Sequence, residues 1–182
     1  MKLTHVDREG KAKMVDVGHK PDTERQAKAH GHVMMSREAY ETVRKGQGPK
    51  GDVFTVAKIA GIQAAKNTSG LIPLCHPLPI SYIDVEFSFR DKEQTIDITS
   101  TVRTRGPTGV EMEALTAVMV TALTVYDMCK AIDKGIELGP FYLLEKSGGK
   151  SGTYKRQGQG SGVKGQGRKP RRNESSLEPW NP

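Results

Sequence analysis

The chain has 182 residues, only 5% aromatic residues and a formal net charge of +7. This length suits one domain, and the low aromatic content predicts a mostly aliphatic core. The two cysteines form neither a disulfide framework nor a CxxC pair, so we expect a reducing compartment, with the cytoplasm as the default. No apolar run approaches a membrane span, and the first ten residues lack the apolar core of a signal peptide, so we expect no membrane role.

The positive charge is concentrated near the C-terminal end of the sequence. Residues 155–182 contain seven basic and two acidic side chains, which leaves 21 basic and 19 acidic ones in residues 1–154. We therefore predict a single, nearly neutral domain over residues 1–154. The Gly- and Gln-rich composition of residues 155–182 predicts a disordered basic tail.

Residues 25–35 alternate between small or apolar and polar side chains, which predicts a strand. A shorter strand is expected at residues 14–17. The polar side of the first of these strands carries His30 and His32. A metal site would need a third ligand, and none is close in sequence, so we favour solvent-facing histidines and expect no metal site.

Two helices are expected next. Ser36 can cap a helix over residues 37–45, and Asp52 can cap another over residues 53–68. The Gly-rich loop between them carries Lys50 directly ahead of a helix N-terminus, where backbone amides and the macrodipole favour anions. A loop lysine is usually only solvated, but this one lies where a phosphate would bind favourably.

Residues 71–80 are apolar but contain three prolines, so they suit neither a helix nor an ordinary strand. Cys75 and His76 lie at the centre of this segment. Adjacent residues of an extended chain point to opposite sides, so a thiolate–imidazolium pair is not expected. Two interpretations stay open: a buried cysteine beside a histidine that faces a site, or two packed side chains.

The longest helix is predicted over residues 108–134, where Thr108 and Glu111 fit a capping box. Asp127 and Lys130 follow i, i+3 and should lie side by side, where a carboxylate and an ammonium can share protons. Spacing alone favours a solvated salt bridge over such an acid–base pair. Apolar residues at helical spacing predict a core-facing stripe of Leu115, Val118, Met119, Ala122, Leu123, Val125, Met128 and Ile132.

The remaining pattern indicates the fold class. Two alternating segments, residues 82–89 and 95–103, flank a short charged turn and predict a β-hairpin, and a last strand is expected at residues 138–144. The order β-α-α-β-β-α-β, with one helix set aside, is the pattern of a ferredoxin-like α+β fold. Helices would cover one face of an antiparallel sheet, and a partner subunit or solvent would meet the other face.

The glycine-rich segment SGGKSG, residues 147–152, lacks the first glycine of a phosphate-binding P-loop, and no helix signal follows it. An ordinary linker is therefore favoured over a loop that wraps a phosphate. Together with three other stretches, however, it closely resembles the MoaC family, cyclic pyranopterin monophosphate synthases of molybdenum cofactor biosynthesis. The resemblance covers about residues 4–154 and is carried by LCHPL (74–78), GVEMEALTA (109–117), YDMCKA (126–131) and SGGKSG.

The resemblance implies a catalytic domain that converts 3′,8-cyclo-7,8-dihydroguanosine 5′-triphosphate to cyclic pyranopterin monophosphate with release of pyrophosphate, as a phosphorus–oxygen lyase. A radical SAM cyclase would make that substrate upstream, so no cofactor is expected here. The resemblance also implies a ferredoxin-like fold assembled as a homo-hexamer, a trimer of dimers with active sites at subunit interfaces.

By motif, the resemblance implies catalytic roles for Asp127, Lys130 and Lys50. A lysine close to other cations and partly buried can lose its proton near neutral pH, which would suit Lys130 to this role. Glu113 and Asp127 lie 14 residues apart, roughly 21 Å along one helix. Either one extended nucleotide spans the helix or the site combines residues from two subunits, and we favour the second. The implied substrate contacts are Leu74, Cys75, His76, Met112, Glu113, Arg25 and Lys66.

The main alternative is a nucleic-acid-binding module, because ferredoxin-like sheets bind RNA and the tail is basic. The aromatic–glycine pattern of RNA-binding sheets is missing from residues 82–89, and the body is nearly neutral, so we expect weak contacts from the tail at most. A third interpretation is a purely structural oligomer scaffold, in which Lys50, Asp127 and Lys130 would tolerate alanine.

Overall fold

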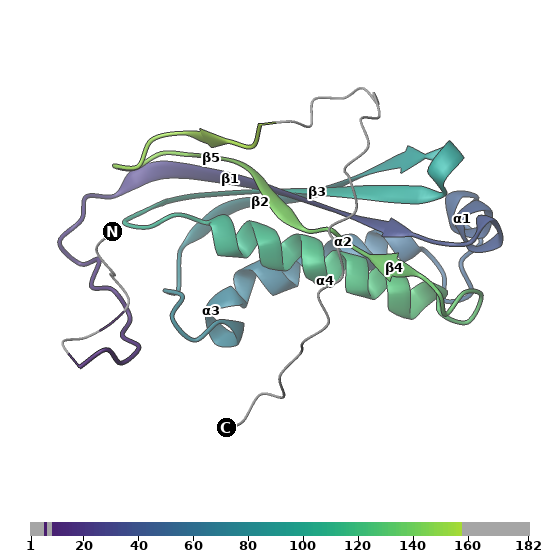
Figure 1. Ribbon diagram of the computed structural model, residues 1–182, viewed down its shortest axis with the longest axis horizontal. Coiled ribbons are helices and arrows are strands. Elements are labelled where there is room, and N and C mark those ends of the chain that lie inside the picture. The colour runs from purple at the N-terminus through teal and green to yellow at the C-terminus, as the bar shows by residue number, and fades with distance from the viewer. Residues whose placement is uncertain (1–5, 7–8, 158–182) are drawn as a thin grey trace, which may run out of the picture.

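The computed structural model describes Val6 and residues 9–157. These residues form a six-stranded antiparallel sheet in the order β2-β3-β1-β5-β6, and a short β4 pairs with β1 (Figure 1). Without β4 and β6, this is the strand order of the ferredoxin-like pattern, so the predicted α+β fold is confirmed. The predicted disorder of the tail concerns mainly residues 158–182, which lie outside the described residues.

Most predicted elements are present. No strand forms at residues 14–17, so that prediction was wrong. The strands are β1 (Thr23–Met34), β2 (Ile80–Arg90), β3 (Thr95–Gly106), β4 (Glu137–Leu138), β5 (Tyr142–Ser147) and β6 (Tyr154–Lys155). The helices are α1 (Arg37–Arg44), α2 (Val53–Lys66), α3 (Thr68–Leu71) and α4 (Glu111–Cys129), with a 3-10 turn η1 (Asp91–Glu93) inside the β2–β3 hairpin.

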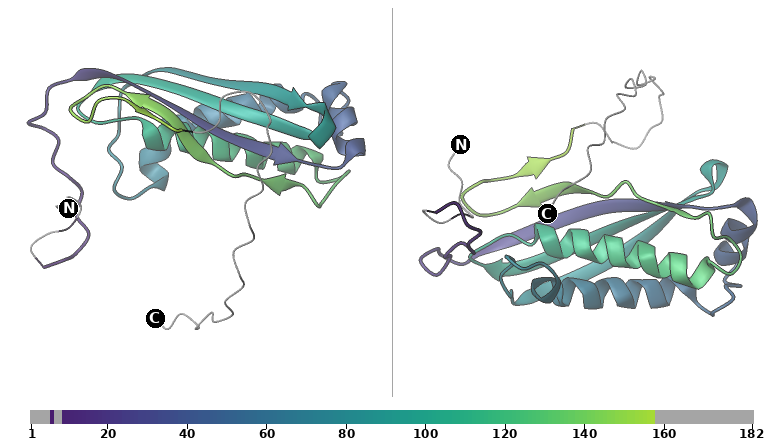
Figure 2. Two further views of the ribbon diagram at one scale, coloured as in Figure 1. Left: turned by 45° about the horizontal axis from the view of Figure 1, so that its top comes forward. Right: turned by 60° about the horizontal axis from the view of Figure 1, so that its bottom comes forward.

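The core lies between the sheet and the two long helices, α2 and α4, which run side by side under one face (Figure 2). Strand β1 turns Ala27, Ala29 and Val33 toward this layer, and all three are fully buried. Gly31 is required on the same side, because a Cβ there would lie 2.7 Å from Val118 Cγ1 of α4. Small residues on β1 thus let the central helix pack closely against the sheet.

Local capping was predicted correctly for the first two helices and wrongly for the longest. Ser36 accepts a hydrogen bond from the Ala39 amide, and Asp52 accepts one from the Thr55 amide. The N-cap of α4 is Val110, which makes no side-chain capping bond. The predicted capping box does not form, because α4 begins at Glu111 and this residue is therefore not the third of the helix. The Glu111 carboxylate instead pairs with Lys146 of β5, at 3.3 Å.

Helix α4 is also shorter than predicted, and its apolar stripe is only partly buried. Val118, Ala122 and Val125 are fully buried, whereas Met119 and Leu123 are 44% and 57% exposed. The two exposed residues lie on the neighbouring side of the helix, which faces away from the sheet. An apolar ridge therefore remains on the outside of the helical layer.

The last predicted strand is divided into β4 and β5 by Gly139, whose φ of +97° belongs to the left-handed region. Beyond β5, the chain turns through SGGKSG and returns as β6 alongside it. Within the described residues, α4 alone is long and apolar enough to cross a membrane, but 56% of that stretch is buried inside the protein. That burial is typical of a core helix.

Candidate active site

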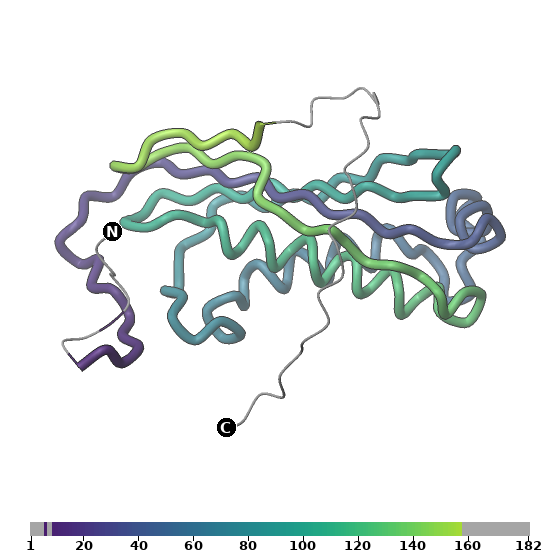
Figure 3. Tube along the Cα trace, in the orientation of Figure 1, coloured from purple at the N-terminus to yellow at the C-terminus, as the bar shows by residue number. Residues whose placement is uncertain are grey.

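Helix α4 separates the predicted site residues into two groups, one near each end. Glu113 lies in its first turn and Asp127 in its last. The segment that precedes β1 lies at the same end of the molecule as the start of α4 (Figure 3). This arrangement brings five predicted substrate contacts together at one end and the three predicted catalytic residues at the other.

The three predicted catalytic residues form a contiguous group, here called the lysine–aspartate cluster: Lys50, Asp127 and Lys130. Lys50 Nζ lies 2.7 Å from Asp127 Oδ2, and Lys130 Nζ lies 2.7 Å from Asp127 Oδ1. Lys50 comes from the loop before α2, whereas the other two come from the end of α4. The predicted side-by-side placement of Asp127 and Lys130 is confirmed.

The charges of this cluster are mutually stabilised. Hydrogen bonds from Lys130 and Lys50 lower the pKa of Asp127 to about 2. The hydrogen bond to Asp127 in turn raises the pKa of Lys130 above its usual value. The sequence-based idea that Lys130 loses its proton near neutral pH is therefore wrong for the isolated chain, because the carboxylate outweighs the desolvation of an exposed ammonium.

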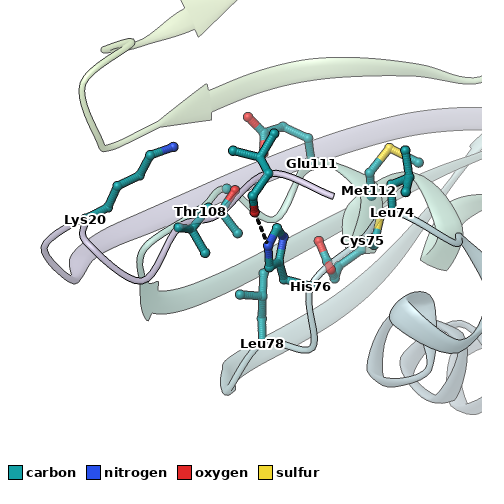
Figure 4. A pocket seen from close by; sticks show the side chains of 12 residues that line it. Lys20, Leu74, Cys75, His76, Leu78, Thr108, Glu111 and Met112 are labelled. Atoms are coloured by element: carbon teal, nitrogen blue, oxygen red, sulfur yellow. Dashed lines mark hydrogen bonds between the residues drawn. The ribbon is translucent and has the colours of Figure 1, made fainter. Parts of the chain in front are cut away.

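A cavity of about 300 Å³ lies beside the first turn of α4 (Figure 4). It brings together five of the seven predicted substrate contacts, which come from the segment before β2 and from α4: Leu74, Cys75, His76, Met112 and Glu113. The Pro-rich segment has no regular structure between α3 and β2. Its stiffness suits it to presenting side chains to a fixed cavity wall.

Cys75 and His76 both line this cavity. The histidine therefore faces a site, as one of the two interpretations expected, but the cysteine beside it is only partly buried. His76 Nε2 donates a hydrogen bond to the Val15 carbonyl oxygen at 2.7 Å, shown by the dashed line in Figure 4. Burial, and next the charge of Glu113, raise the pKa of the Cys75 thiol. The cysteine therefore stays protonated at neutral pH and is not a nucleophilic thiolate.

Glu113 is the most unusual charged group of this cavity. Its residue is only 4% exposed, and burial raises the pKa of its carboxyl group. Glu113 takes part in none of the ion pairs found among the described residues. A buried carboxylate without a cationic partner gains most from a ligand that donates hydrogen bonds to it.

A second cavity, of about 730 Å³, adjoins the first, and the two share Lys20, Thr108, Gly109 and Glu111. Its lining includes four cationic side chains: Lys20, Arg25, Lys146 and Lys150. The sequence analysis identified Arg25 alone among these four. SGGKSG carried the missing signal for Lys150, whereas no sequence pattern marks Lys20 or Lys146.

Arg25 is held rigidly in the second cavity. Its Nε donates to the Gly106 carbonyl and its NH2 group to the Pro107 carbonyl, both at 2.9 Å. Gly149 approaches this guanidinium so closely that a Cβ there would lie 2.7 Å from Arg25 Cζ. The SGGKSG loop thus packs onto Arg25 and forms one wall of a cation-lined cavity instead of acting as a plain linker.

Lys66 is the predicted contact that the described residues do not bring into either cavity. It is exposed in the last turn of α2 and lines neither cavity. Its predicted role in substrate binding within one chain therefore has no support from this geometry.

The MoaC family model matches residues 14–149. A cyclic pyranopterin monophosphate synthase from Heliobacterium modesticaldum is 56% identical over 155 residues, covering 85% of this chain and 98% of the relative. Enzymes of the same name from Geobacillus kaustophilus and Peptoclostridium acidaminophilum are 54% and 52% identical, covering 85% and 86% of this chain and 97% and 99% of those relatives. The chain therefore belongs to the MoaC family.

Proposed function

We propose that this protein is a cyclic pyranopterin monophosphate synthase. In this proposal it is a phosphorus–oxygen lyase that converts 3′,8-cyclo-7,8-dihydroguanosine 5′-triphosphate to cyclic pyranopterin monophosphate and pyrophosphate. A radical SAM cyclase would supply the substrate, and the cytoplasm would be the site of both reactions. The names of relatives that are 52–56% identical over nearly their whole length support this proposal.

One observation carries the proposal: a buried carboxylate and a cation-lined space lie in adjoining cavities. A ligand that fits both must present hydrogen-bond donors at one end and a polyanion at the other. The guanine-derived edge and the triphosphate of the proposed substrate have these properties. A plain scaffold or a nonspecific RNA-binding sheet would not need them.

Glu113 is proposed to hold the guanine-derived end of the substrate. A carboxylate accepts two parallel hydrogen bonds from an amine and a neighbouring ring amide. Because burial raises the pKa of Glu113, these ligand hydrogen bonds would also favour its ionised form in the complex. Recognition and ionisation of Glu113 would therefore be coupled.

The cations of the second cavity are proposed to hold the triphosphate. Lys20, Lys146 and Lys150 supply ammonium groups around the fixed guanidinium of Arg25. Forming the cyclic phosphate requires a ribose-derived hydroxyl to attack the inner phosphorus while pyrophosphate leaves. Cations fixed near the leaving group stabilise the charge that develops on it.

The lysine–aspartate cluster is proposed to supply the acid–base chemistry from a neighbouring copy of the chain. Along one chain it lies roughly 21 Å from Glu113, too far for one compact site. The outer side of α4 carries the exposed apolar residues Met112, Met119 and Leu123, which suit contact between copies. In the proposed homo-hexamer, a paired copy would bring its cationic cavity toward Lys130, and these charges would lower the pKa of that lysine.

Turnover tests the proposal directly. The purified full-length protein is incubated with the cyclised dihydroguanosine triphosphate, and pyrophosphate release is measured together with formation of the cyclic phosphate. We expect both products in equal amounts. A correctly folded oligomer that released no pyrophosphate from this substrate would refute the proposed reaction.

Sharing of the site between copies is tested by mixing two inactive chains. An Asp127→Ala chain and a Glu113→Ala chain are unfolded together, refolded and assayed. If one site uses Asp127 of one copy and Glu113 of another, some sites in mixed oligomers keep both residues and activity returns. Mixed oligomers of confirmed composition that stayed inactive would count against shared sites.

A further inference from the structure

The outer face of the sheet, opposite the helices, carries two histidines and an aspartate on adjacent strands. His32 of β1 pairs with Asp97 of β3, and His30 lies two residues earlier on β1. Since Ala29 and Gly31 face the helical layer, both imidazoles project from the other face. His30 Nε2 lies 3.4 Å from Asp97 Oδ1, and the three potential ligand atoms lie within 4.8 Å of one another.

We propose that His30, His32 and Asp97 form a binding site for a divalent transition-metal ion such as Zn²⁺ or Co²⁺. Two imidazoles and one carboxylate are a common protein donor set for these ions, with water as the fourth ligand. Metal–ligand bonds of about 2.0–2.2 Å in a tetrahedral arrangement place ligand atoms roughly 3.3 Å apart. One pair already has this spacing, and the other pairs lie within 4.8 Å, so small side-chain rotations would bring all three ligand atoms onto one ion.

The surroundings of the three residues also suit a bound ion. The His30 and Asp97 side chains are each only 17% exposed, and the Tyr142 ring lies 5.1 Å from the His30 ring. The group is thus sheltered and faces one shared space.

Arg90 opposes metal binding at this site. Its Nε lies 2.8 Å from Asp97 Oδ2, and its NH2 group lies 3.1 Å from Asp97 Oδ1. A metal on Oδ1 displaces the second of these bonds and leaves the first in place. Because the Arg90 side chain is 40% exposed, it can turn toward water, but its charge still weakens the binding of a cation.

The experiment is a Co²⁺ titration of the metal-free full-length protein in a buffer without phosphate, followed by the visible absorption of imidazole-bound Co²⁺ and by calorimetry. We expect one ion per chain, displaced by Zn²⁺. His30→Gln and His32→Gln should each weaken binding at least about tenfold, since loss of even an outer partner of a metal ligand costs 10- to 100-fold. His19→Gln is the matched control, and we expect it to bind Co²⁺ like the unchanged protein.

Arg90→Gln provides the opposite result from the same site. It removes the competing charge, so Co²⁺ should bind several-fold more tightly, which no general surface site would show. Circular dichroism and thermal melting check that each variant is folded. Absence of the visible absorption, unchanged affinity in His32→Gln, unchanged or weaker affinity in Arg90→Gln, or one ion per two chains would each overturn the site as proposed. These outcomes are independent of pyrophosphate release, so they do not depend on the proposed enzymatic function.

Discussion

The two ends of α4 place a carboxylate in opposite surroundings. Glu113 is 4% exposed near the N-terminal end, and burial raises its pKa. The side chain of Asp127 is 53% exposed near the C-terminal end, where two ammonium groups hold its pKa at about 2. The same chemical group is therefore prepared for a ligand that donates hydrogen bonds at one end and is permanently charged at the other. We infer that one end recognises substrate while the other organises protons and charge.

The largest expected effect comes from the C-terminal end. Lys130→Ala removes the ammonium group that contacts Asp127 Oδ1. If this group transfers a proton in the reaction, pyrophosphate release should fall about 10²- to 10⁴-fold. Lys134→Ala, an exposed lysine four residues further along, is the control and should leave turnover unchanged. Normal turnover in Lys130→Ala would remove this lysine from the mechanism and break the division between the two ends.

A smaller effect is expected at the N-terminal end. Glu113→Gln keeps the shape of the side chain but removes a charged acceptor worth about 1.5–3 kcal/mol in a hydrogen bond. We expect KM for the cyclised substrate to rise roughly 10- to 100-fold, with a smaller change in kcat. Steady-state kinetics measure the separation. A variant in which kcat fell while KM stayed constant would show that Glu113 acts in the chemical step.

The two carboxylates should also affect stability in opposite directions as pH changes. Asp127 has a lowered pKa, so its contribution to folding is present above the ordinary value of 3.8 and is lost as pH falls toward about 2. Glu113 has a raised pKa, so its contribution is present below 4.5 and is lost as pH rises through its value in the folded protein.

Urea unfolding at a series of pH values measures both contributions. Asp127→Asn should lose part of the decline in stability on the acid side. Glu113→Gln should gain stability relative to the unchanged protein as pH rises above 4.5. Parallel stability curves for all three proteins would mean that the surroundings of the two groups differ less than their exposure indicates.

The smallest effect is expected from deletion of residues 158–182. If the substrate-binding and catalytic residues lie at the two ends of α4, this deletion removes none of the contacts to the transition state. Pyrophosphate release by the shortened chain should then match that of the full chain within about twofold. The deletion begins beyond β6 and so preserves the described fold. Loss of turnover in a folded shortened chain would favour the alternative in which the basic tail carries the main activity.

Sequence patterns predicted the features that depend on neighbouring residues. Caps at Ser36 and Asp52 and the β2–β3 hairpin are local, and each formed as expected. The Thr108–Glu111 capping box did not form, because the helix begins only at Glu111, whose carboxylate pairs with Lys146, a residue distant in sequence. A local pattern cannot reveal a competitor that only the folded sheet brings near.

The same limit applies to the candidate sites. Asp127 and Lys130 share a helix, so their contact was predictable, whereas the addition of Lys50 rests on how the loop before α2 folds. The sequence placed His30 and His32 on one face of a strand but offered no third metal ligand nearby. Asp97 lies next to them only because of the register between β1 and β3. Lys20 and Lys146 were missed because only the folded chain brings these two residues, distant in sequence, to the same cavity.

The length of α4 has a further consequence. Glu113 and Asp127 are joined by one continuous helix, in which 14 residues make just under four turns. Their separation and their relative direction are therefore set together by the residue count between them. One residue inserted near Met119 would rotate Asp127 by about 100° and shift it by about 1.5 Å relative to Glu113. A change in the length of this helix should thus disturb the placement of its two ends far more than the exchange of a residue that contacts neither group.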